Sequence, residues 1–268
     1  MNKQATLIFY LARKSSRFSI NTLSTYEKRI SDFLESTDHE LSEIVIDDYL
    51  EFEANKLMHG TDRSTLSTTR AACKSLINFA LEEDVLAFNP LKGLRRTKLK
   101  KAIPRYLDDA TVDGIKDAAK YNLRDSAIIH TLLVTGVRVS ELIEITKSDC
   151  DMEHRQIHIR KSKDLEERMV PITPTCRERI ERYINTRNDN APYLFVNSKG
   201  GKISRQGVLY IVKQYAEMSG AKVNVTVHSF RHTFAHKLSK AGAPLEFIAK
   251  LLGHTRLDMA RRYTGPTK

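Results

Sequence analysis

An arginine in the second half of the chain stands where it could hold a phosphate. In residues 135–142, TGVRVSEL, Gly136 should end one helix and Arg138 should begin the next, with Glu141 one turn further on. A guanidinium is always charged and offers a phosphate a fork of N–H donors. An arginine three residues before a glutamate is also a common surface ion pair, so this motif alone decides nothing.

A second motif, HSFRH at residues 228–232, adds a histidine and another arginine. The spacing puts His228 and Arg231 on one face at the start of a predicted helix, where backbone N–H groups also favour an anion. With His232 and His236, His228 forms a series at helical spacing that could suggest metal ligands. Three histidines spread along a helix in this way cannot all converge on one ion, so we expect no zinc site.

A candidate nucleophile lies close to the end of the sequence. Residues 251–254 read LLGH, and Tyr263 stands nine residues after His254. A tyrosine in such a place is usually a packing residue, but its hydroxyl can become a nucleophile when cationic side chains gather around a phosphate beside it. The chemistry would then be transfer of a phosphoryl group to the tyrosine oxygen.

The order of these motifs resembles that of the tyrosine recombinase (phage integrase) family, most of all its Xer-type recombinases and compact mobile-element integrases. The resemblance covers nearly the whole chain and rests on TGVRVSEL, a hairpin lysine, HSFRH, LLGH and the tyrosine that follows. It implies that Tyr263 is the nucleophile and that Glu141 supports a catalytic arginine without reacting. The catalytic residues that it implies are Arg138, Lys163, His228, Arg231, His254 and Tyr263.

The lysine has two candidates, which both lie on the turn of the predicted hairpin. Lys163 stands eight residues before Pro171, which is the family's usual spacing, and we choose it for that reason. Lys161 remains the alternative. The same turn is acidic from Asp164 to Glu167, where relatives are often basic.

These residue types meet the needs of phosphodiester cleavage. The two arginines would stabilise charge on the non-bridging oxygens, His228 would accept the tyrosine proton, and Lys163 would protonate the departing 5′-oxygen. A phosphotyrosine keeps the bond energy, so we expect neither a metal nor a nucleotide cofactor. The resemblance thus implies a site-specific DNA recombinase with a 3′-phosphotyrosyl intermediate. A type IB-like topoisomerase, a catalytically silent DNA-binding protein of the same fold and a zinc hydrolase are the alternatives.

Helical periodicity and turn residues indicate which elements position these side chains. In the first half, apolar residues recur at helical spacing near 4–14, 22–35, 44–58 and 64–83, with Thr22, Asp47 and Ser64 as predicted caps. In the second half, helices are predicted near 109–119, 124–135, 175–187, 204–218, 229–241 and 245–251, with a hairpin at 156–160 and 168–172. The fold class is therefore mainly α with a small β-sheet.

The linker at residues 96–105 divides the chain into two predicted domains. It holds five basic residues and no acidic ones, follows Asn89-Pro90 and contains Pro104, so helices should stop on either side of it. We expect domains at 1–95 and 106–268. The resemblance implies that the first is a SAM-like, core-binding helical bundle, that the second is a mixed α/β catalytic domain, and that the two clamp DNA.

Charge and composition favour a DNA partner. The formal net charge is +11 and the pI is about 9.5, as expected for a surface that binds a polyanion. The resemblance implies double-stranded DNA with paired inverted-repeat sites. Three isolated cysteines, the lack of a signal-peptide pattern and the lack of a long apolar run favour the cytoplasm, with no membrane partner.

The sequence after Tyr263 leads to an expectation about assembly. Relatives in this family exchange a C-terminal helix between protomers, whereas the five residues Thr-Gly-Pro-Thr-Lys are too few to form one. We therefore expect a monomer in free solution and a tetramer on synapsed DNA.

Overall fold

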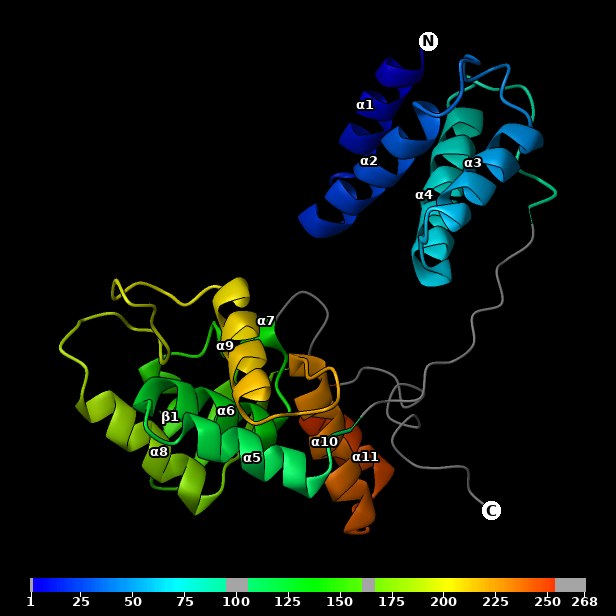
Figure 1. The fold of residues 1–268 in the computed structure, drawn as a ribbon. Helices are drawn as coiled ribbons and strands as arrows, with labels where there is room; N and C mark the ends of the chain where they lie inside the picture. The colour runs from blue at the N-terminus through cyan, green and yellow to red at the C-terminus, as the bar shows by residue number, and fades with distance from the viewer. Residues whose placement is uncertain (1, 95–105, 161–166, 254–268) are drawn as a thin grey trace. The chain divides into compact units, whose positions relative to one another are not determined.

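The computed structural model describes residues 2–94, 106–160 and 167–253 (Figure 1). The chain forms two compact units, Met1–Lys101 and Ala102–Lys268, and each is described by itself.

The N-terminal unit is a bundle of amphipathic helices. Within its described residues it comprises α1 (Lys3–Lys14), α2 (Ile20–Leu34), α3 (Ile46–Met58) and α4 (Arg63–Glu82). Helix α4 packs along α2, and the aromatic rings of Phe33, Tyr49 and Phe52 meet edge to face or tilted in the core. The helices predicted from periodicity are confirmed, with their ends shifted by a few residues.

The predicted helix caps in this unit are wrong. The residue before the first helical turn is Ser19 for α2, Val45 for α3 and Asp62 for α4. Periodicity locates a helix face but not its first residue. At two of these ends the free backbone N–H group is bound by a hydroxyl or carboxylate that lies two or three residues before the predicted cap. In α3 the first-turn carboxylate of Asp48 accepts the Val45 N–H instead.

The C-terminal unit surrounds a buried helix, α6 (Leu123–Thr135). Helices α5, α8 and α10 pack against it, and its side chains are buried on nearly every face. The described elements of this unit, in order, are α5 (Asp109–Ala119), α6, α7 (Val139–Leu142), η1 (Lys147–Asp149), β1 (Cys150–Asp151), β2 (Gln156–Ile159), β3 (Arg168–Pro171), α8 (Pro174–Asn185), α9 (Arg205–Met218), α10 (Val227–Lys240) and α11 (Leu245–Leu252).

The sheet is antiparallel in the order β1-β2-β3. The predicted hairpin is confirmed, with His158 opposite Met169 and Ile159 opposite Arg168. Strand β1 was not predicted, since two residues are too few to show an alternating pattern. The fold class expected from the sequence, mainly α with a small β-sheet, is confirmed.

Gly136 determines how closely three helices approach. It ends α6 in the left-handed conformation, with φ at 61°, as the sequence predicts. A Cβ on this glycine would lie 2.5 Å from the ring of Phe234 on α10 and 3.1 Å from Leu252 on α11. The missing side chain therefore brings the ends of α6 and α11 against α10.

Within the described ranges, no helix is both long enough and apolar enough to cross a membrane.

Candidate active site

Arg138 is placed by the turn that follows α6. It stands immediately before the single-turn helix α7, and its backbone N–H donates to Glu141 Oε2 at 2.7 Å. Its guanidinium makes two long contacts, both at 3.4 Å, to Glu141 Oε1 and to the carbonyl oxygen of Leu252. The side chain is 23% exposed, so it still faces solvent.

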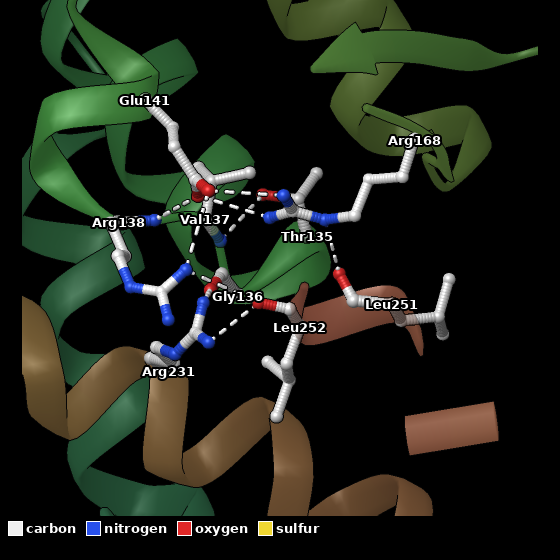
Figure 2. A network of polar contacts seen from close by, with 9 residues as sticks. All are labelled: Thr135, Gly136, Val137, Arg138, Glu141, Arg168, Arg231, Leu251 and Leu252. Carbon is white, nitrogen blue, oxygen red and sulfur yellow. Dashed lines mark hydrogen bonds and ion pairs between the residues drawn. The ribbon is translucent and has the colours of Figure 1, made fainter. Parts of the chain in front are cut away.

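Arg231 reaches the same carbonyl oxygen from α10. Its Nη2 donates to Leu252 O at 2.7 Å and its Nη1 donates to Gly136 O at 2.8 Å. Both carbonyls stand at helix ends, where no backbone N–H of the same helix is left to pair with them. The two arginines that the sequence singled out therefore come together on one acceptor, as Figure 2 shows.

His228 lies one turn before Arg231 but is accessible to solvent, whereas Arg231 is buried. Desolvation by its surroundings, followed by the charges of Arg231 and Arg138, lowers the pKa of His228 below its ordinary value. The imidazole is therefore held neutral near pH 7, as a proton acceptor requires.

The other two histidines of the series point to different neighbours. The rings of His228 and His232 lie 6.3 Å apart, while His236 stacks on Tyr106 with ring centres 3.7 Å apart. His236 is thus engaged by the ring of Tyr106, and among the described residues no three histidines, cysteines or acids are grouped so as to hold a metal ion.

Arg168, the first residue of β3, was not among the predicted site residues. It is buried and donates from Nη1 and Nη2 to the two carboxylate oxygens of Glu141, at 3.0 Å each. Its Nε donates to Leu251 O at 2.7 Å (Figure 2). The sequence does contain a signal that would have identified Arg168. In an alternating strand it lies on the same face as Val170, which is buried, and an arginine that faces the core requires a partner.

Glu141 is a buried carboxylate shared by two arginines. Burial by itself would raise the pKa of Glu141, but the hydrogen bonds and charge of Arg168, followed by those of Arg138, lower it below its ordinary value. The surface-pair interpretation is therefore wrong. Glu141 accepts the backbone N–H of Arg138 at 2.7 Å, but the guanidinium that binds both of its carboxylate oxygens is that of Arg168, at 3.0 Å each, while the Arg138 guanidinium lies at 3.4 Å.

Four of the predicted residues lie outside the described residues. They are Lys163, its alternative Lys161, His254 and Tyr263. Strands β2 and β3 place the two ends of the predicted hairpin, and α11 ends at Leu252, two residues before His254.

The phage integrase family model matches residues 105–268, which include every motif described above. The chain belongs to the phage integrase family. The tyrosine recombinase XerC of Staphylococcus epidermidis is 30% identical over 275 residues, covering 98% of this chain and 93% of that protein. The tyrosine recombinase XerA of Pyrococcus horikoshii is 33% identical over 253 residues, covering 93% and 84% respectively.

Solved structures show the same fold. A lambda integrase dimer bound to a COC′ core site matches this integrase-family chain with a TM-score of 0.85 at 19% identity, covering 100% of it and 79% of the lambda chain. The crystal structure of XerA recombinase matches with a TM-score of 0.58 at 24% identity, covering 99% and 94%. The family predicted from the sequence is confirmed, and the protein is a tyrosine site-specific recombinase; the topoisomerase and silent DNA-binding alternatives are not favoured.

Proposed function

We propose that Tyr263 of this recombinase attacks a DNA phosphate whose non-bridging oxygens are held by Arg138 and Arg231. One observation carries the proposal. The two guanidinium groups come from different elements yet meet at the carbonyl oxygen of Leu252. Two permanent cations so close together create a positive potential that attracts a further anion, and the two non-bridging oxygens of a phosphate suit two guanidinium groups.

In the proposed step a phosphoryl group passes from the 5′-oxygen of the DNA to Tyr263. The Tyr263 oxygen bonds to phosphorus, the bond from phosphorus to the 5′-oxygen breaks, and a 3′-phosphotyrosine forms. His228 accepts the tyrosine proton, and Lys163, or Lys161 in its place, gives a proton to the leaving 5′-oxygen. His254 adds a contact to a phosphate oxygen. The arginines supply the positive charge, and the phosphotyrosine keeps the bond energy for rejoining, so the step uses neither a metal nor a nucleotide.

The proposed partner is double-stranded DNA. The structural neighbours include a lambda integrase dimer bound to a core site and a lambda integrase tetramer bound to a Holliday junction. We propose that this chain likewise acts on double-stranded DNA with paired inverted-repeat sites, and forms a tetramer when two sites are synapsed. In this proposal residues 1–95 and 106–268 contact the DNA as two domains joined by the basic linker 96–105. Action on DNA also favours the cytoplasm as its location.

A suicide substrate tests the proposed nucleophile. Wild-type protein should form a covalent protein–DNA adduct that survives a denaturing gel, and Tyr263→Phe should form none while binding DNA with nearly unchanged affinity, because only a hydroxyl is removed. Tyr210→Phe is the matched control, since Tyr210 is an exposed tyrosine on α9. An adduct that persists in Tyr263→Phe would show that another residue is the nucleophile.

A further inference from the structure

We infer that Arg168 is a positioning residue for DNA cleavage, which keeps Glu141 from capturing the guanidinium of Arg138 and fixes the end of α11. The inference rests on the proposed role of Arg138. Arg168 is nearly fully buried, at 8% exposure, and each of the three contacts made by its guanidinium joins β3 to a part of the candidate active site.

Arg168 and Arg138 share Glu141 unequally. Arg168 occupies both carboxylate oxygens at 3.0 Å, in the two-pronged geometry that is the strongest available to such a pair. The guanidinium of Arg138 is left with two contacts at 3.4 Å, near the outer limit of a hydrogen bond. Arg138 is therefore held loosely enough to turn its fork to a phosphate.

Removing the Arg168 charge would reverse this sharing. A buried carboxylate that loses its main partner is strongly disfavoured, and it pairs with whatever cation is nearest. That cation is Arg138, which stands three residues away and already touches Oε1. A guanidinium drawn fully onto Glu141 would no longer be free for the phosphate, so Arg168 protects Arg138 without touching it.

Arg168 also contacts the end of α11. Arg168 Nε binds Leu251 O, and the guanidinium lies directly against Gly253, where a Cβ would come within 2.7 Å of Nη1. Gly253 has φ at 63° and ends the helix. Arg168 therefore fixes the place where the chain leaves α11, one residue before the proposed catalytic His254.

The alternative is that Arg168 only stabilises the fold, and the chain offers a matched control for this. Arg187 forms a comparable pair with Asp189 after α8, with the arginine side chain 4% exposed against 5% for Arg168. Its other partners are loop carbonyls of Ala191, Tyr193 and Leu194, none of them in the candidate site. Arg187→Met measures what the loss of a buried arginine costs by itself.

The experiment is a set of single-turnover cleavage rates on a suicide substrate, with DNA affinity and thermal unfolding measured for each variant. The variants are Arg168→Met, Arg168→Lys, Glu141→Gln, the double variant Arg168→Met with Glu141→Gln, and Arg187→Met. Arg168→Met should keep its DNA affinity but cleave about 10²-fold more slowly, as displaced catalytic groups typically do. Arg187→Met should lose thermal stability and cleave at the wild-type rate.

The double variant decides between positioning and stability. Glutamine still accepts the Arg138 backbone N–H but carries no charge to capture its side chain. Glu141→Gln should therefore restore cleavage by about tenfold in the Arg168→Met background, a coupling typical of groups in one ion-pair network. Arg168→Lys, which keeps the charge but loses the fork, should fall between wild type and Arg168→Met.

Two results would overturn the inference. One is wild-type cleavage by folded Arg168→Met. The other is a slow Arg168→Met that Glu141→Gln does not speed up, which would mean that Arg168 acts on the DNA or only on folding. The proposed function fails in a different way: wild-type protein would then form no adduct that depends on Tyr263. The two failures can therefore be told apart.

Discussion

The guanidinium of Arg231 on α10 donates a hydrogen bond of 2.8 Å to the carbonyl oxygen of Gly136, which lies 95 residues earlier at the end of α6. This bond joins the two motifs that the sequence singled out. It requires α10 to approach α6 closely, and the approach depends on the absence of a side chain at Gly136. Arg231 is therefore positioned by a glycine that takes no part in the chemistry.

Gly136→Ala should consequently impair both stability and cleavage. The positive φ costs about 1–2 kcal/mol for an alanine, and the overlap with Phe234 should add roughly 1–3 kcal/mol. Gly220→Ala is the control, because Gly220 also has a positive φ of 70° but nothing within 4 Å of its Cβ position. Urea unfolding should show a larger loss for Gly136→Ala, and suicide-substrate cleavage should fall only for that variant. Equal losses of stability in the two variants would show that the contact with Phe234 does not matter.

The general acid can be identified with a modified leaving group. Lys163→Ala should slow cleavage of a normal phosphodiester far more than cleavage of a 5′-bridging phosphorothioate, because sulfur leaves without needing a proton. Lys161→Ala, on the same turn, is the control and should slow neither substrate strongly. If only Lys161→Ala shows the selective rescue, the role belongs to Lys161; equal slowing of both substrates by Lys163→Ala would rule out its acid role.

His228 should titrate below its ordinary pKa of 6.5, because desolvation and the charges of Arg231 and Arg138 disfavour its protonated form. Cleavage should then fall as the pH drops through this lowered value, when His228 can no longer accept a proton. In the unfolded state His228 has its ordinary pKa and binds a proton below about pH 6.5, whereas in the folded state it binds one only at lower pH. Lowering the pH below about 6.5 should therefore reduce the free energy of unfolding.

Histidine-selective NMR on free protein measures this titration. His39 provides an internal reference, since its hydrogen bond and charge interaction with Asp48 raise its pKa. Arg138→Gln should move the His228 midpoint upward and leave that of His39 in place. A His228 midpoint above 6.5 would count against its role as the proton acceptor.

DNA affinity should depend steeply on salt concentration. If six or more phosphates are neutralised by the basic surface, affinity should fall by about 10³-fold or more between roughly 50 and 200 mM salt. Tyr263→Phe is the suitable protein for this measurement, because it cannot trap the DNA covalently. A nearly flat response would contradict the proposed contact of two domains with the DNA backbone.

The sequence by itself determined the helices, the hairpin, the family and the arginine and histidine motifs of the site. These features are local. Apolar spacing marks the buried face of a helix, Gly136 marks a helix end because few other residues adopt a positive φ, and strand alternation fixes the hairpin register. Motif order then sufficed to indicate a tyrosine recombinase.

Only the tertiary structure decided which groups these side chains contact. Glu141 was expected to support Arg138, its neighbour in sequence, and it contacts that residue, but the guanidinium that binds both of its carboxylate oxygens belongs to Arg168, 27 residues away. The carbonyl oxygens of Gly136, Leu251 and Leu252 became acceptors because helix ends leave them unpaired and packing brings the arginines to them. A sequence pattern gives the face on which a side chain lies, whereas its partner is set by how separate elements pack.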